Sequence, residues 1–253
     1  MYIVFDLEFN QDFSDESVKS ANGNMYPFEI IQIGAVKLDY GLNVIKTFNR
    51  YIRPDIYKKV SPFIEKLTGI STEMLTNQKS FSEIYSEFIE FIEDINSIFC
   101  IWGMSDIKEL YKSAEYYKQN INLLPKMFIN IQPYASLYFK IPKKTQLQLQ
   151  SVVDMLQIST AREFHNALND AYYTAEVFKK IYNETFQPVI YNPDYIKPRI
   201  RQQKRIIDTE SLIKQFEKMY DRTITEEEKS MIILAYKMGK TGQFLKDKND
   251  NSV

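Results

Sequence analysis

The sequence predicts an α/β protein in which a mixed, five-stranded sheet is flanked by helices and followed by a helical C-terminal extension. Three observations predict this class: strand-like segments open the chain, helical and strand-like segments then alternate, and a cluster of three prolines precedes two amphipathic segments near the C-terminal end. The 253 residues suit one domain of about 150–200 residues plus an extension. Hydrophobic residues make up 44% of the chain, which supplies a sizeable core and excludes global disorder.

The strands are predicted from short apolar runs that are rich in β-branched and aromatic residues. Residues 39–43, Asp-Tyr-Gly-Leu-Asn, form a hairpin-type connection between the second and third runs, so the first three strands are expected to be antiparallel. The predicted strands span residues 2–9, 29–38, 44–52, 96–102 and 127–131.

The helices are predicted from apolar residues at helical intervals and from capping patterns. Ser80 and Glu83 have capping-box spacing, as do Thr225 and Glu228, and Gly239 is expected to end the last helix. The predicted helices span residues 80–94, 105–117, 132–139, 146–156, 166–182, 208–220 and 225–238, with shorter helical patterns within 61–75.

The prolines at 188, 193 and 198 predict a linker, which gives a main domain over residues 1–185, a linker over 186–206 and a helical extension over 207–253. The linker contains a run of basic side chains that either follows the backbone of a nucleic acid or is simply solvated. These are Lys197, Arg199, Arg201, Lys204 and Arg205.

Composition excludes several other classes. The chain lacks the run of about 18 apolar residues that a membrane span needs, and its N-terminus lacks the basic region of a signal peptide. The single cysteine, Cys100, excludes an internal disulfide framework and a cysteine-rich zinc site. The expectation is therefore a cytoplasmic protein with no membrane partner. The net charge of −1 provides no strong field that would attract nucleic acid.

Two carboxylates interrupt the first apolar run. Asp6 and Glu8 are two residues apart, so in a strand both project from the same face. If that face is buried, the carboxylates repel each other and lose hydration, and a proton or a hard divalent cation relieves the repulsion. The alternative is an edge strand on which both side chains face solvent.

A third carboxylate, Asp106, follows the strand that ends at Trp102-Gly103. Ser105 is the expected N-cap of the next helix, and an acidic residue in a first helical turn interacts favourably with the helix dipole. This interaction by itself would explain an acidic residue at position 106. Strand ends are also where sheet enzymes assemble their sites, which is the functional alternative.

The only histidine, His165, lies five residues before Asp170. On a continuous helix the two side chains would be about 140° apart, so they meet only if His165 precedes a helix that is capped near Asn166. Asp170 lies beside, rather than opposite, the expected apolar stripe of that helix. The stripe consists of Leu168, Ala171, Tyr172, Ala175 and Phe178. An isolated histidine is more often a surface or capping residue than a catalytic one.

The order of these pieces, Asp-x-Glu, Asp after Trp-Gly, and His-x-x-x-x-Asp, resembles the DEDDh family of 3′–5′ exonucleases, which have a ribonuclease H-like fold. More narrowly it resembles the Eri-type branch, which includes bacterial members related to a sporulation-pathway inhibitor. The resemblance covers about residues 1–185 and includes the stretches 29–36, 51–54 and 67–70. Phe9 departs from it, since many proofreading-type relatives have threonine there, and residues 10–26 and the tail have no assigned counterpart.

The resemblance implies phosphodiester hydrolysis with two Mg²⁺ or Mn²⁺ ions held by Asp6, Glu8, Asp106 and Asp170. It implies that His165 is the general base, since an imidazole titrates near neutral pH. The implied substrate is the 3′ end of single-stranded RNA or DNA, with RNA favoured because the Eri-type branch mostly trims RNA.

The expected substrate contacts are the backbone at Leu7, a base stacked on Phe9, and the basic side chains of Arg199, Arg201 and Lys204. For Phe9, an ordinary core position is the favoured alternative. Two other functions stay open: a non-catalytic regulator that binds a protein partner through the C-terminal helices, and a proofreading exonuclease bound to a polymerase.

Overall fold

The computed structural model describes residues 1–11, 28–142, 146–193 and 208–240. The chain forms two units, Met1–Tyr195 and Ile196–Val253, which are described separately. Within the described ranges, every helix is too short or too polar to cross a lipid bilayer.

The first unit is built on one mixed sheet with the strand order β3-β2-β1-β4-β5-β6. Strands β1 to β3 are antiparallel, β4 and β5 run parallel to β1, and β6 pairs antiparallel with β5. The strands are β1 (Tyr2–Asn10), β2 (Glu29–Leu38), β3 (Val44–Tyr51), β4 (Ile98–Ile101), β5 (Met127–Asn130) and β6 (Val189–Ile190). The α/β class and the antiparallel start are confirmed.

The expected count of five strands was wrong by one. Val189 and Ile190 pair with Phe128 and Met127 and add a sixth strand at the edge of the sheet. Two residues next to Pro188 are too few to show an alternating pattern, so the sequence placed them in the linker.

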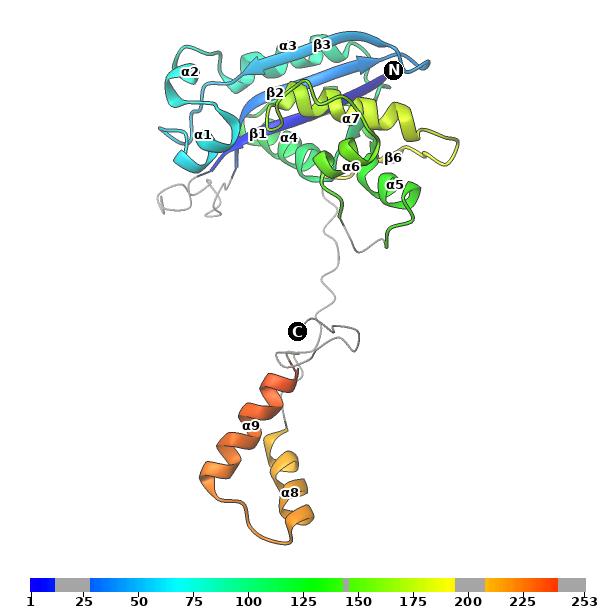
Figure 1. The fold of residues 1–253 in the computed structure, drawn as a ribbon. Helices are drawn as coiled ribbons and strands as arrows, with labels where there is room; N and C mark the ends of the chain where they lie inside the picture. The colour runs from blue at the N-terminus through cyan, green and yellow to red at the C-terminus, as the bar shows by residue number, and fades with distance from the viewer. Residues whose placement is uncertain (12–27, 143–145, 194–207, 241–253) are drawn as a thin grey trace. The chain divides into compact units, whose positions relative to one another are not determined.

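Helices cover both faces of the sheet (Figure 1). One face packs against α3 and α4, and the other against α5, α6 and α7. The short helices α1 and α2 pack beside β1 and β2, and the 3₁₀ turn η1 lies beside α4. The bounds are α1 (Pro62–Thr68), α2 (Thr72–Thr76), α3 (Phe81–Ile92), α4 (Ser105–Tyr116), the 3₁₀ turn η1 (Ile121–Leu123), α5 (Ile131–Tyr138), α6 (Leu149–Met155) and α7 (Ala167–Ile181).

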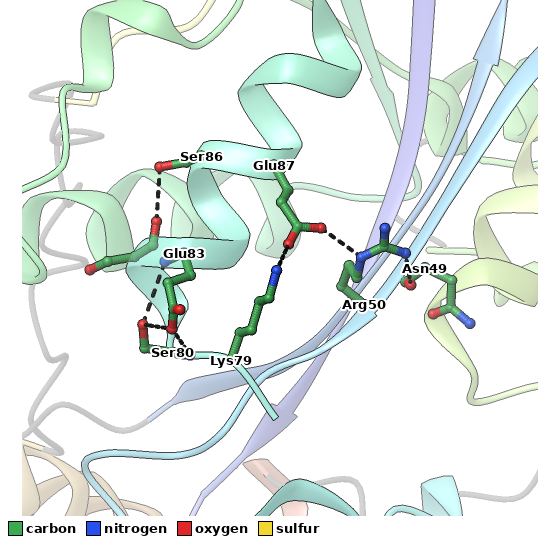
Figure 2. Close-up of polar contacts among 8 residues, drawn as sticks. Asn49, Arg50, Lys79, Ser80, Glu83, Ser86 and Glu87 are labelled. Carbon is green, nitrogen blue, oxygen red and sulfur yellow. Dashed lines mark hydrogen bonds and ion pairs between the residues drawn. The ribbon is translucent and has the colours of Figure 1, made fainter. Parts of the chain in front are cut away.

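Polar contacts fix α3 to the strand beside it (Figure 2). The expected capping box is confirmed, since the Ser80 side chain accepts from the backbone N–H of Glu83 and the Glu83 carboxylate accepts from Ser80. The Glu87 carboxylate accepts from Arg50 of β3 at 2.7 Å and from Lys79 at 2.6 Å. Arg50 and Lys79 are exposed, so these ion pairs orient α3 more than they stabilise it.

Two expected helix ends were wrong. The N-cap of α4 is Met104, which makes no capping side-chain bond, and Ser105 is already the first helical residue. In the second unit, which contains α8 (Thr209–Tyr220) and α9 (Glu226–Lys240), Gly239 lies inside α9 instead of after it. The capping contact between Thr225 and Glu228 is confirmed, with the Glu228 N–H donating to Thr225 Oγ1 at 3.3 Å.

The start of α7 lies directly on β2, and two residues of that strand make this close contact possible. An added Cβ on Gly34 would lie 2.0 Å from the backbone nitrogen of Leu168 and 2.1 Å from the carbonyl carbon of Ala167. Two residues earlier, Gln32 Oε1 accepts the N–H of Ala167 at 3.2 Å, and Gln32 Nε2 donates to Asn49 at 2.8 Å. Gly34 therefore provides the space and Gln32 the hydrogen bond that holds the first turn of α7.

Gly34→Ala should lower the free energy of unfolding of the first unit by about 3 kcal/mol or more, because the new methyl group meets backbone atoms that cannot move aside. Urea unfolding followed by the fluorescence of the single tryptophan, Trp102, measures this unit. Gly41→Ala is the matched control, since its Cβ would meet only the side chains of Asn43 and Asp39. Equal stability of the two variants would contradict the close seating of α7.

Candidate active site

Asp6 and Glu8 project from the face of β1 that packs against α7. Asp6 is opposite Gly34 and Glu8 is opposite Gln32 in the antiparallel register with β2, and the register shifts just after Glu8. Such an irregularity bends a strand and re-aims the side chains beside it. β1 lies between β2 and β4 and Glu8 is only 9% exposed, so the alternative of an edge strand with both carboxylates facing solvent is wrong.

Asp170 comes to the same place from the first turn of α7. One carboxylate oxygen from each of Asp6, Glu8 and Asp170 lies within 4.8 Å of the other two. The sheet thus joins residues 6 and 170, which are distant in the sequence, because α7 starts directly above β2.

Asp106 approaches from the other layer of the molecule. It lies in the first turn of α4, is 6% exposed, and is hydrogen-bonded to the backbone of Leu7. Its charge is the largest electrostatic influence that another residue exerts on Asp6. Asp106 therefore borders the group formed by Asp6, Glu8 and Asp170, although its oxygens are outside the 4.8 Å group.

All four carboxyl groups resist ionisation. Burial, followed by the charges of its acidic neighbours, raises the pKa of Asp6 well above its ordinary value. Burial, with the charges of Asp170 and Asp106, raises the pKa of Glu8 to about 8. Burial raises the pKa of Asp106 to about 7 despite backbone hydrogen bonds that lower it, and raises the pKa of Asp170 to about 6 despite the N–H of His165.

The residues fit a hard divalent cation. The donors are all carboxylate oxygens, the ligand type that Mg²⁺ and Mn²⁺ prefer. Asp170 Oδ1 is buried and has no hydrogen-bond partner among the described residues. A cation would satisfy this oxygen and relieve the repulsion that raises the pKa values of Asp6 and Glu8.

His165 lies just before α7, as it must if it is to be near Asp170. Asn166 is the N-cap of the helix, and its side chain accepts from the N–H groups of Leu168 and Asn169. The His165 side chain is exposed, and its backbone N–H donates to Asp170 Oδ2 at 3.1 Å.

The expected apolar stripe of this helix was partly wrong. Tyr173 is fully buried, whereas Tyr172 is half-buried. Adjacent tyrosines have similar hydrophobicity, so the spacing alone assigned the wrong one to the core.

Of the expected substrate contacts, the structure describes Leu7 and Phe9, and both side chains pack in or against the core. The Leu7 side chain is buried on the α3–α4 face of the sheet, and its backbone is already bonded to Asp106. Phe9 is half-buried, packs against the core, and has its ring centroid 5.8 Å from that of Phe28. Arg199, Arg201 and Lys204 lie outside the described residues.

Gln32 and Gly34 are the positions that sequence reasoning missed. Both lie in the strand EIIQIGAVKL, where a buried glutamine and a glycine interrupt an apolar run. That interruption is a usable signal, because a glycine within a strand often marks a close backbone approach. It does not reveal that the approaching backbone belongs to residues 167 and 168.

The fold and the carboxylate cluster define the class: a ribonuclease H-like sheet whose central strand and flanking helices supply acidic residues to one site. The chain matches the exonuclease family model of RNase T over residues 3–178. It therefore belongs to this family of DEDDh 3′–5′ exonucleases.

The matches with two individual relatives cover only part of each relative's sequence. A PolC-type DNA polymerase III of Thermotoga petrophila is 32% identical over 156 residues, which are 59% of this chain and 10% of that polymerase. The chain thus spans about a tenth of that relative. The 3′-5′ exoribonuclease 1 of Rattus norvegicus is 24% identical over 62% of this chain and 48% of its own.

Among solved structures, the nuclease domain of 3′hExo, a DEDDh family member bound to rAMP, has a TM-score of 0.62. It is 20% identical, and the match covers 76% of this chain and 96% of that one. This likeness confirms the ribonuclease H-like fold.

The raised pKa values predict how stability depends on pH without metal. The folded state holds protons that the unfolded state releases near pH 4, so the free energy of unfolding should fall as pH rises from about 4 to 8. Glu8→Gln should reduce this fall by at least about 1 kcal/mol, since one unit of pKa is about 1.4 kcal/mol. Urea unfolding at pH 5 and pH 8 measures the difference.

The control is Glu65→Gln, which changes an exposed carboxylate of α1 and should keep the wild-type pH dependence. Added Mg²⁺ should stabilise the wild type more at pH 8 than at pH 5, because it binds the ionised carboxylates. If the free energy of unfolding changed between pH 5 and pH 8 by the same amount in the wild type and in Glu8→Gln, that result would contradict the electrostatic account.

Proposed function

We propose that the protein is a metal-dependent 3′–5′ exonuclease that hydrolyses the phosphodiester bonds of single-stranded nucleic acid. One observation carries this proposal: Asp6, Glu8 and Asp170 bring carboxylate oxygens within 4.8 Å of one another, beside His165. Family membership and the fold agree with it.

Asp6, Glu8, Asp106 and Asp170 would hold two Mg²⁺ or Mn²⁺ ions. Such ions, when bound, stabilise the charge on the attacking and leaving oxygens of a displacement at phosphorus. His165 accepts the proton of the attacking water, and its exposed side chain passes that proton to solvent. Asp170 fixes the backbone of His165 through the 3.1 Å hydrogen bond and so links the base to the acidic cluster.

The substrate grip would combine stacking and charge. Phe9, near the end of β1 just after Glu8, is half-buried, and a terminal base would stack on its ring. The basic side chains of Arg199, Arg201 and Lys204 would follow the phosphates further along the strand. We place RNA first among substrates, because the Eri-type resemblance and the similarity to a 3′-5′ exoribonuclease favour it.

A second candidate is a proofreading exonuclease on DNA that is associated with a polymerase. The 32% identity to a PolC-type DNA polymerase favours it. Co-purification with a polymerase, together with faster removal of a mismatched than a matched DNA 3′ end, would distinguish this candidate from an RNA-trimming enzyme.

The C-terminal helices suit a protein partner. In α8 and α9 several large apolar side chains are exposed, including Met219, Tyr220 and Leu234. Such exposure often marks an interaction surface. A partner bound there would recruit or regulate the nuclease.

The activity itself is tested with single-stranded RNA and DNA labelled at the 3′ or the 5′ end. With Mg²⁺, the 3′ label should be released first and the 5′-labelled strand should shorten as a ladder. Asp6→Ala should lower the rate at least about a thousandfold, and His165→Ala about 10²–10⁴-fold, the range that a general base supplies.

Glu65→Ala serves as the surface control and should cut at the wild-type rate. Chelation should abolish the activity and Mn²⁺ should restore it. Intact substrates of both kinds after long incubation with the wild type would refute the nuclease and favour the non-catalytic regulator.

Simultaneous replacement of Arg199, Arg201 and Lys204 by alanine tests the basic stretch. If each contacts one phosphate, the slope of log K against log salt concentration for a long single strand should become less steep by about 2, since each contact contributes about 0.7. Fluorescence anisotropy at several salt concentrations, with Ca²⁺ in place of Mg²⁺, measures the slope. An unchanged slope would assign these residues to a solvated linker.

A further inference from the structure

The backbone just before α7 is held in an unusual conformation. His165 has a φ of +64°, in the left-handed region that residues other than glycine seldom adopt. Such a conformation persists only where the surroundings impose it. The imidazole direction therefore depends on the contacts that hold residues 162–165.

Tyr173 supplies the central contacts. Its hydroxyl accepts from the backbone N–H of Arg162 at 2.9 Å and donates to the backbone carbonyl of the same residue at 2.6 Å. Its ring stacks on that of Phe164, with centroids 4.6 Å apart and planes 25° from parallel. The Tyr173 side chain is fully buried, so its direction is fixed by the core.

Two further side chains of α7 hold the same segment. Asn169 Nδ2 donates to the carbonyl of Glu163 at 2.9 Å, and Asp170 Oδ2 accepts the N–H of His165 at 3.1 Å. Successive residues from Arg162 to His165 thus each have a contact with one helix. The segment is anchored to α7 along its length.

We propose that Tyr173, assisted by Asn169, is a positioning residue that sets the place of His165, an inference that rests on the proposed function. Tyr173 acts through the segment 162–165, because its hydroxyl bonds to the backbone of Arg162 and its ring stacks on Phe164. A phenylalanine would fill the same core space and keep the ring stack. The hydroxyl is needed only to fix the backbone of Arg162.

The first test is a double-mutant cycle of Tyr173→Phe and His165→Ala, with rates measured on a short RNA oligonucleotide in Mg²⁺. Tyr173→Phe should lower kcat about tenfold, the factor that one to two ordinary hydrogen bonds supply, and leave KM unchanged. In the His165→Ala background it should cause no further loss, because the group it positions is already absent.

The second measurement does not depend on activity. Since the chain contains one histidine, selective ¹⁵N-histidine labelling gives a single amide signal, that of His165. Its order parameter should be near 0.85 in the wild type and fall below about 0.6 in Tyr173→Phe, the range of a flexible backbone. Asn169→Ala should lower it as well, and provides the test if Tyr173→Phe does not fold.

Tyr85→Phe is the matched control. The Tyr85 ring is also buried, and its hydroxyl donates to a backbone carbonyl, that of Asn120, on the α3 side of the sheet. Its kcat and its His165 amide signal should equal those of the wild type.

Three results would overturn the inference: an unchanged kcat in Tyr173→Phe, an equal tenfold loss in the His165→Ala background, or an amide that stays rigid in Tyr173→Phe and Asn169→Ala. A wild type without nuclease activity, or a His165→Ala variant as active as the wild type, would instead refute the proposed function. The His165 amide signal tests whether Tyr173 and Asn169 anchor residues 162–165, whether or not the protein is a nuclease.

Discussion

Carboxyl groups that are buried close together cannot all be ionised unless a positive charge joins them. This constraint governs the first unit of the protein. Asp6, Glu8 and Asp170 share one small space, and Asp106 adds its charge from the neighbouring layer. Without a cation, burial raises the pKa values of all four groups, repulsion raises those of Asp6, Glu8 and Asp106 further, and Glu8, with a pKa of about 8, keeps its proton at neutral pH. A divalent ion would let the carboxyl groups ionise and would itself gain oxygen ligands. The same ion would attract the phosphates that a protein with a net charge of −1 does not otherwise attract.

The surrounding fold makes this crowding possible. β1 lies at the centre of the sheet between β2 and β4, so its side chains meet a helical layer on each face. Gly34 lets the first turn of α7 touch the sheet beside Asp6, and Gln32 fixes that turn by a hydrogen bond. Residues 162–165, the segment that contains His165, are in turn anchored to side chains of α7. The start of α7 thus places both Asp170 and His165, and a single packing contact on Gly34 brings them to the acidic residues of β1.

Sequence reasoning succeeded where a local pattern determines the outcome. Strand alternation placed Asp6 and Glu8 on one face, and the capping chemistry of Asn166 placed His165 before its helix. It failed where tertiary contacts decide. The edge strand at residue 189 is too short to show a pattern, and the choice between Tyr172 and Tyr173 as the buried ring depends on what lies beneath α7. The resemblance to the DEDDh family predicted that Asp106 lies near Asp6, which residue spacing alone could not predict.

We propose that these carboxylates form a site for two divalent cations. Crystals of the wild type grown with Mn²⁺ and measured at the manganese absorption edge test it most directly. The account predicts two anomalous peaks within about 2–2.5 Å of oxygens from Asp6, Glu8, Asp106 and Asp170, and their loss in Asp6→Asn. Well-ordered crystals whose carboxylates turn away from one another, with no peak among them at millimolar Mn²⁺, would contradict it.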